Sequence, residues 1–185
     1  MQIIIEIDIS VDQYVEQEFH KRVLAPEQCG NCGQVVAFNV LGTYKRYTTN
    51  DSGSDVLFKV ARFKCRSCKR TTSCLPSFAQ PYRQLASETI EGFIAGDYDR
   101  LDVRHFEWLL IRYSRDFTQW YKSLLSIVGS RFGRAPPGEN ATAFLRRAVA
   151  VCGSFAELTI RLVREFRTTC FRIYRCHQPS CCYSH

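Results

Sequence analysis

The sequence predicts an α+β protein, with a small four-cysteine β-hairpin domain of the zinc-ribbon type followed by an all-helical domain. Two Cys-x2-Cys pairs flank a stretch rich in β-branched and aromatic residues, which favour strands. Helical signals then dominate from residue 87 onward. With 185 residues, the chain is long enough for one compact domain or two small ones.

Residues 1–25 are expected to form an N-terminal strand and arm. Residues 2–9, QIIIEIDI, alternate after the first isoleucines, as a short strand does. The following DQYVEQEFHKRV fits either a helical turn or an extended arm. No signal peptide and no apolar stretch long enough to span a membrane is visible, so we expect a cytoplasmic protein with no membrane partner. In a reducing compartment, clustered cysteines bind metal more often than they form disulfides.

Residues 26–80 are expected to form the hairpin domain. The segments VVAFNVLGTYKRYTT and VLFKVARF have the composition of strands, and the turn-forming NDSGSD lies between them. LPSFAQPY, residues 75–82, contains two prolines and is predicted to break the structure and mark the domain boundary.

The two cysteine pairs are candidate ligands of one structural Zn²⁺ ion. Zinc prefers four ligands in a tetrahedron, and a hairpin would bring the two pairs together. Gly33 suits the positive φ that such turns often need. Four buried thiols without metal, or iron on the same ligands, are the alternatives; a redox pair is less favoured because neither pair opens a helix. The candidate ligands are Cys29, Cys32, Cys65 and Cys68.

The remaining cysteines have separate interpretations. Cys74 is expected to be a buried apolar residue rather than a ligand. The last ten residues look like a tail, in which a second metal site is an open alternative to simple mobility. Its candidate ligands are Cys176, His177, Cys181, Cys182 and His185.

Residues 81–135 are expected to be helical with a candidate helix-turn-helix, and residues 136–185 to form a C-terminal helix and tail. Ser87 is a candidate N-cap and Gly96 a candidate stop for the first helix. From Phe106 to Ile127, apolar residues recur at steps of four and three, which predicts a helical stripe. This stripe fits one long helix, or two if Asp116 caps a separate recognition helix over residues 117–128. The later helix is expected to be interrupted at Gly153.

The charge balance favours a polyanionic partner, with a basic protein lacking one as the alternative. The formal net charge is +7, and the basic excess lies after residue 28. A continuous late helix would bring four arginines, from Arg161 to Arg175, within about 80° of one another. An ordinary solvated face is the alternative for each helical surface. The candidate nucleic-acid contacts are Lys45, Arg46, Arg62, Lys64, Arg66, Lys69, Arg70, Arg83, Gln119, Lys122, Arg161, Arg164, Arg172 and Arg175.

The run FKCRSCKRTTSCLPSFAQPYRQLASETIEGF resembles the zinc-ribbon region of insertion-sequence transposases and of short bacterial proteins of transposase-like type. The resemblance covers roughly residues 25–95 and implies a ribbon followed by a helix-turn-helix that binds element DNA. Strand transfer is not implied, because the acidic residues after residue 100 lie in helical patterns rather than on an RNase H-like fold. The matching residues are Cys29, Cys32, Gly33, Cys65, Cys68, Arg70, Thr71, Leu75, Pro76, Pro81, Tyr82 and Arg83.

These observations lead us to expect a non-catalytic, transposase-like DNA-binding protein whose ribbon is fixed by zinc. No Ser-His-Asp order, phosphate loop or zinc-hydrolase motif points to an enzyme. One alternative is a zinc-ribbon adaptor that binds protein through its aromatic-rich helix. Another is a degenerate or partner-dependent transposase. A homo-oligomer or a complex with a transposase is compatible with each of them.

Overall fold

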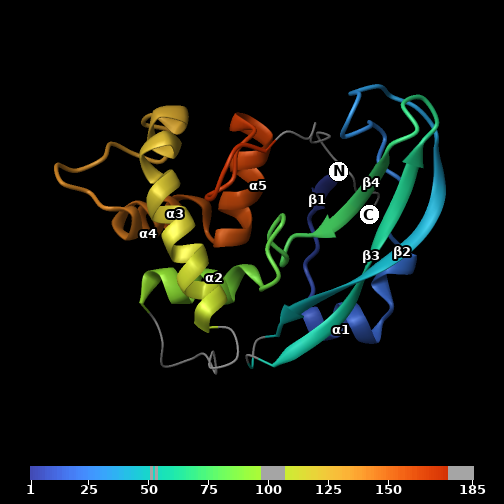
Figure 1. The fold of residues 1–185 in the computed structure, drawn as a ribbon, viewed down its shortest axis with the longest axis horizontal. Helices are drawn as coiled ribbons and strands as arrows, with labels where there is room; N and C mark the ends of the chain where they lie inside the picture. The colour runs from blue at the N-terminus through green and yellow to red at the C-terminus, as the bar shows by residue number, and fades with distance from the viewer. Residues whose placement is uncertain (51, 53, 97–106, 175–185) are drawn as a thin grey trace. The chain divides into compact units, whose positions relative to one another are not determined.

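A computed structural model describes residues 1–50, 52, 54–96 and 107–174. The described residues divide into two compact units, Met1–Ala86 and Ser87–Tyr174. The first unit carries a four-stranded sheet and the second is helical (Figure 1), so the predicted α+β class is confirmed. The first unit includes the N-terminal residues that were expected to form a separate arm, and it extends to residue 86 rather than 80.

The sheet has the strand order β1-β4-β3-β2. The predicted hairpin is formed by β2, Phe38–Thr49, and β3, Asp55–Cys65, which pair antiparallel. Next to β3 lies β4, Thr71–Pro76, which was not predicted, and the LPSFAQPY segment thus contributes the end of a strand. The outer strand β1, Gln2–Ile5, pairs parallel with β4, which explains why the N-terminus belongs to this unit.

The segment after β1 folds into helix α1, Val11–Glu16, and the 3₁₀ turn η1, Phe19–Lys21. Helix α1 begins with a reciprocal capping box, in which Ser10 and Gln13 each accept a backbone hydrogen bond from the other. Tyr14 of α1 is fully buried, and its hydroxyl donates to the Lys59 carbonyl at 3.1 Å. Of the two alternatives for this segment, the helical turn is therefore the one that forms, and it packs against β3.

Apolar clusters lie on both faces of the sheet, because alternate residues of β3 point in opposite directions. On one face, Phe58 and Val60 pack with Tyr14 and Leu75. On the other, Phe63 packs with residues that include Ile3, Ile5, Ala61 and Cys74.

The helical unit contains α2, Ser87–Ala95, α3, Glu107–Val128, α4, Ala141–Cys152, and α5, Phe155–Phe166. Gly96 follows α2 with a φ of 82°, as its predicted role as a stop requires. The predicted interruption at Gly153 is also confirmed, and Ser154 caps α5 by accepting from the Glu157 backbone N–H at 3.1 Å. In the part of the chain that the structure describes, no helix is both long and apolar enough to cross a membrane.

Of the two alternatives for the stripe from Phe106 to Ile127, one long helix is confirmed. Helix α3 is continuous through Asp116, so the alternative of a separate recognition helix over residues 117–128 is wrong. The reason is that the buried stripe runs unbroken from Leu110 through Phe117 to Leu124. Helix α5 ends at Phe166, so the late arginines do not share one helical stripe.

The early end of α5 has a local cause. Arg167 adopts a left-handed conformation with a φ of 51° and turns the chain out of the helix. Thr168 then pairs with Ile173 in an isolated bridge, and hydroxyls of Thr168 and Thr169 each donate to the Arg172 carbonyl at 3.1 Å. This hydroxyl-stabilised turn competes with helix continuation, as threonine side chains often do.

Candidate metal centre and basic surfaces

The four predicted cysteines come together at one end of the sheet. Cys29 and Cys32 belong to the loop before β2, whereas Cys65 ends β3 and Cys68 lies in the turn to β4. Their four sulfur atoms all lie within 4.8 Å of one another. The structure therefore confirms the clustering of these residues as a candidate metal site.

The two pairs sit in turns with the same backbone hydrogen bonds. In the first, the Cys29 carbonyl accepts from Gly33 N–H at 2.9 Å, and Cys29 N–H donates to the Gln34 carbonyl at 2.9 Å. In the second, the Cys65 carbonyl accepts from Lys69 N–H at 3.1 Å, and Cys65 N–H donates to the Arg70 carbonyl at 3.0 Å. The two thiols of each pair are therefore held by a turn with the same pattern of backbone hydrogen bonds.

The sulfur spacing suits a tetrahedral ion. The Sγ atoms of Cys29 and Cys68, one from each turn, are 3.7 Å apart. A metal–sulfur distance of about 2.3 Å gives a tetrahedron with an edge of about 3.8 Å between sulfurs. Four thiolates fill such a shell, which leaves no open position for a substrate or a catalytic water.

Hydrogen bonds favour the thiolate form that metal binding requires. A backbone hydrogen bond from Arg70 is the main cause that lowers the pKa of Cys68 to about 6. Asn31 adds to this effect because its side-chain amide donates to the Cys68 sulfur at 3.5 Å. Its backbone N–H also donates to the Cys29 sulfur at 3.4 Å. Asn31 was missed at the sequence level, since only the folded turns bring it to both pairs.

The other candidate metal ligands are not part of this cluster. Cys74 lies in β4 and is buried with Ile3, Ile5 and Phe63, as expected for an apolar residue. The candidate ligands of the second site, Cys176, His177, Cys181, Cys182 and His185, lie outside the described residues.

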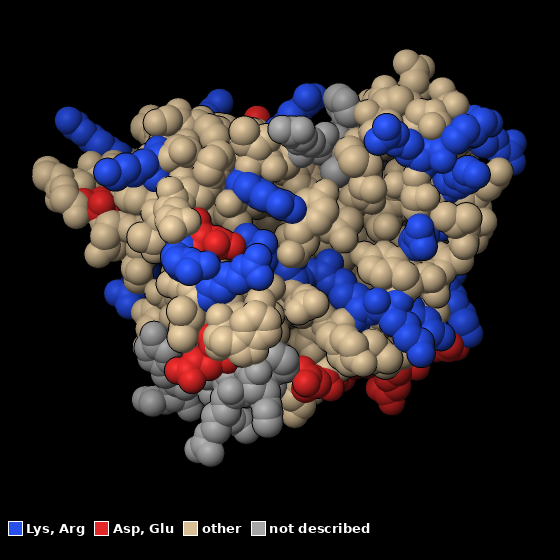
Figure 2. Space-filling model, viewed as in Figure 1, with Lys and Arg blue, Asp and Glu red and all other residues tan. Residues whose placement is uncertain are grey.

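Most basic candidates of the sheet unit are exposed, and several surround the cysteine cluster. Lys64 precedes Cys65 on β3, and Arg66, Lys69 and Arg70 follow in the turn. Figure 2 shows Lys and Arg side chains gathered over this end of the sheet, at the upper right of the view. Elsewhere on the sheet, Lys45 is exposed, whereas Arg62 and Arg83 are half-buried, with Arg62 lying over the Tyr44 ring at 5.8 Å.

Arg46 does not fit its predicted role as a nucleic-acid contact. Its side chain is only 9% exposed and donates to the Gln80 carbonyl at 2.6 Å. It packs on the face of the sheet that carries Phe58, its direct partner on β3. Arg46 is therefore a structural residue that ties β2 to the segment following β4.

On α3, the structure places Gln119 and Lys122 on the exposed face, as expected. Because α3 is continuous, this face also includes the exposed Arg112 and Arg115, which precede Gln119 at helical spacing. Neither arginine was among the predicted contacts, because those contacts were drawn from a recognition helix that begins after Asp116. We call Arg112, Arg115, Gln119 and Lys122 the α3 stripe.

The arginines after residue 160 do not form one surface. Arg161 is bonded to Glu165 at 2.8 Å and lies over the Phe132 ring at 5.2 Å, so its charge is already partnered. Arg164 is exposed on α5, whereas Arg172 lies in the turn after it. Arg175 lies outside the described residues.

Residues 29–113 match a family described as Domain of unknown function (DUF6431). The match begins at the first cysteine and ends within α3, and it spans somewhat less than half of the chain. It therefore includes both cysteine turns and the hairpin between them. No curated protein and no solved structure matches this chain.

Proposed function

We propose that this protein binds DNA in a zinc-dependent way and is not itself a catalyst. Zinc would fix the two cysteine turns, and the exposed cations around them would contact phosphates. The observation that carries the proposal is the position of Lys64, Arg66, Lys69 and Arg70 around the cysteine cluster. The resemblance of residues 25–95 to transposase zinc ribbons supports the same function.

The donor chemistry favours zinc at this site. Four thiolates in a tetrahedral cluster form a common structural zinc shell, and Cys29, Cys32, Cys65 and Cys68 would hold the ion. The bound ion supplies folding free energy to the two turns and no reaction chemistry. Iron accepts the same ligands, so metal analysis of the purified protein decides between the two. One zinc per chain supports the proposal, and iron would overturn this part of it.

The positive charge around the cysteine cluster exceeds what would neutralise a metal ion bound by four thiolates. A divalent ion with four thiolates has a formal charge of −2, which two cations offset. Residues 56–87 contain seven Lys and Arg and no Asp or Glu. The side chains of Lys64, Lys69 and Arg70 form no hydrogen bond or ion pair with any residue that the structure describes. The excess positive charge is therefore available for a polyanion.

The α3 stripe provides a second candidate DNA contact. Arg112, Arg115 and Lys122 are likewise unpartnered among the described residues. Arginine and lysine at such positions contact phosphates, and Gln119 can read a base edge. We propose that each unit contributes one surface.

A protein partner is the second candidate function. Trp108 and Ile111 of α3 are 65% and 55% exposed, which is unusual for such large apolar side chains. A second copy of this chain or a transposase could cover them. Association that is insensitive to salt would favour this adaptor function over DNA binding.

Titration of the metal-loaded protein on duplex DNA at several salt concentrations tests the proposal. We expect tight binding at low salt that weakens steeply as salt rises and is lost with a chelator. Replacing both Lys64 and Lys69 with Ala should reduce the slope of log K against log salt by about 2. Arg134→Ala is the matched control, because Arg134 is an exposed cation of the helical unit that belongs to none of the proposed contact surfaces. Absence of binding at low salt would overturn the proposal.

A further inference from the structure

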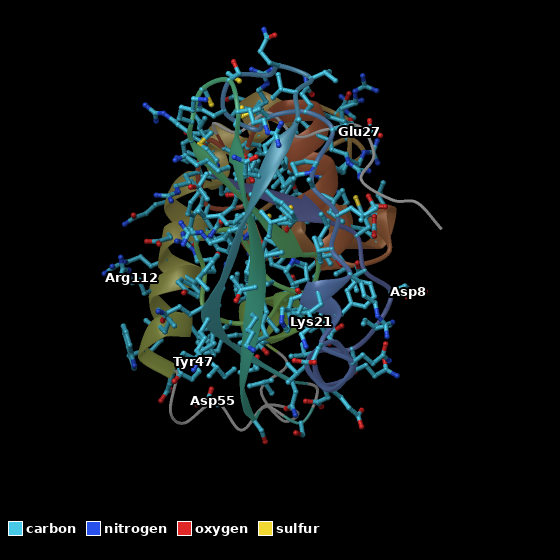
Figure 3. All side chains as sticks on the ribbon, turned by 90° about the vertical axis from the view of Figure 1, so that its right-hand side faces the viewer. Asp8, Lys21, Glu27, Tyr47, Asp55 and Arg112 are labelled. Atoms are coloured by element: carbon cyan, nitrogen blue, oxygen red, sulfur yellow. The ribbon has the colours of Figure 1, made fainter. Side chains whose placement is uncertain are left out.

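One half of a sheet face is left uncovered near the β2–β3 turn. The face that carries the Phe63 cluster continues along the hairpin to Thr43, Lys45, Tyr47, Leu57 and Lys59, all of which are exposed. Direct cross-strand pairing of Lys45 with Lys59 and of Tyr47 with Leu57 places these four side chains on the same face. We call these five residues the hairpin platform. Figure 3 shows Tyr47 near Asp55 at this end of the sheet, with Glu27 at the opposite end.

The platform contains an unfavourable pair of like charges. Side chains directly opposite each other in antiparallel strands have Cβ atoms about 5 Å apart, and two cations there destabilise the sheet. Lys45 has no side-chain partner among the described residues. Lys59 lies near Glu18, but that carboxylate is already hydrogen-bonded to Lys21. An anion seated between the two lysines would relieve this repulsion.

The neighbouring turn adds to the positive charge. The segment η1 packs against β3 and carries His20 and Lys21. Burial and then the positive charge of Lys59 lower the pKa of His20. Lys21, Lys59 and His20 therefore lie near the same carboxylate, that of Glu18, in this part of the described structure.

Next to the lysine pair lies an exposed aromatic ring. Tyr47 is 62% exposed and Leu57, directly opposite, is 39% exposed. The two pairs are two residues apart along the strands, a distance of about 7 Å. One nucleotide can therefore place its base on the ring while its phosphate lies at the lysines.

We propose that the hairpin platform binds single-stranded nucleic acid, with a base stacked on Tyr47 and a phosphate held between Lys45 and Lys59. A duplex does not offer a free base face to such a ring, whereas an unpaired strand does. An acidic peptide would use the lysines but would gain little from the exposed ring. This inference deepens the proposed DNA-binding function and rests on it, while assigning it a further surface on the sheet unit and a second form of nucleic acid.

Fluorescence anisotropy with labelled oligodeoxyuridylate and oligouridylate of about 15 nucleotides tests the inference on the metal-loaded full chain. Tyr47→Ala should weaken binding about tenfold, because it removes the stacking ring. Tyr47→Phe should bind as the unchanged protein does. Val151→Ala is the control, because it removes a 52% exposed apolar side chain from α4, outside the α3 stripe, and should have no effect. Loss of affinity for either oligomer on Tyr47→Ala supports the inference, and the oligomer bound more tightly identifies the preferred sugar.

Lys45→Glu distinguishes a binding role from a structural role, because its expected effects on affinity and on thermal stability have opposite signs. It should weaken oligomer binding and at the same time raise the melting temperature, since it replaces a repulsive cross-strand pair with an attractive one. If Tyr47→Ala and Lys45→Glu both leave oligomer binding unchanged while salt-dependent duplex binding persists, the inference fails and the proposed function stands. If neither oligomers nor duplex bind at low salt, both fail. If only the Lys64 and Lys69 double variant loses oligomer binding, the platform is overturned in favour of the metal end.

Discussion

Gly33 and Lys69 occupy equivalent positions in the two cysteine turns. Each lies four residues after the first cysteine of its pair and donates its backbone N–H to the carbonyl of that cysteine. Each has a positive φ, 71° for Gly33 and 60° for Lys69. Glycine adopts this conformation without penalty, whereas a residue with a Cβ atom does so at a cost.

The equivalence predicts opposite effects for substitutions at the two positions. Lys69→Gly should stabilise the metal-loaded protein by about 0.5 to 1 kcal/mol, because it removes left-handed strain. Gly33→Ala should destabilise it by about 1 kcal/mol for the same reason. Urea unfolding of both variants measures these changes. A destabilised Lys69→Gly protein would show that the lysine side chain contributes more than its backbone costs.

Cys68 should be the most reactive thiol of the cluster in the metal-free protein. Hydrogen bonds, led by that of the Arg70 backbone, lower its pKa to about 6, so it is mostly thiolate at pH 7. We expect iodoacetamide to modify Cys68 first at pH 7 and much more slowly below pH 6, as mass spectrometry of peptides can follow. Replacing Asn31 with Ala should slow the reaction, since it removes the amide that donates to Cys68. Equal labelling of all four thiols would contradict this prediction.

Removal of the metal should unfold the cysteine end of the sheet more than the rest. Cys65→Ser should abolish zinc binding, which contributes on the order of 10 kcal/mol to folding in small zinc domains. Hydrogen exchange should then become fast in residues 26–37 and 65–70. The cluster around Tyr14 and Phe58 should keep more of its protection, because it has an apolar core of its own. Native zinc content in this variant would contradict the proposed ligand set.

Alanine substitutions at Arg46 and Lys64 should have contrasting effects. The first should lower the stability of the protein, and the second should weaken DNA binding. Arg46→Ala removes a charged donor to the buried Gln80 carbonyl, which then keeps only the weaker bond from Arg83 N–H at 3.1 Å, and should cost about 2 kcal/mol of stability. Lys64→Ala removes an exposed cation and should change stability by less than about 0.5 kcal/mol while weakening DNA binding. Thermal unfolding and DNA titration of both variants test this contrast. Unchanged stability of Arg46→Ala would return Arg46 to the list of candidate DNA contacts.

The pair formed by Arg147 and Glu139 should make the helical unit sensitive to acid. Arg147 donates to both Glu139 carboxylate oxygens, at 2.7 and 2.8 Å, and to the Gly133 carbonyl at 2.7 Å. The Glu139 side chain is 3% exposed, so Glu139→Gln should cost about 2 to 3 kcal/mol.

The stability that the Arg147–Glu139 pair contributes should decrease as the pH falls. The hydrogen bonds from Arg147 lower the pKa of Glu139 below its ordinary 4.5. The ion pair therefore contributes its full stability above that value and loses it as the pH falls through the lower folded pKa. Urea midpoints between pH 3 and 6 should fall less in Glu139→Gln than in the unchanged protein. Parallel curves would show that the pair carries no pH-dependent stability.

Local sequence patterns determined the elements that depend on neighbouring residues. The β2–β3 hairpin follows from strand composition on either side of a turn-forming segment, and the cysteine cluster follows from two pairs at its ends. The stop at Gly96 and the break at Gly153 follow from the conformational freedom of glycine. Each of these signals is contained in a few consecutive residues.

Tertiary structure alone decided the features that depend on distant partners. The strand β4 and its parallel pairing with β1 could not be predicted, because Ile3 and Cys74 meet only after folding. The burial of Arg46 depends on the carbonyl of Gln80, and the continuity of α3 depends on a buried stripe that outweighs the capping signal of Asp116. The opposition of Lys45 and Lys59 likewise depends on strand register, including the bulge between Val40 and Gly42. The sequence by itself thus determined the candidate metal ligands and the hairpin, whereas packing decided which basic residues remain exposed.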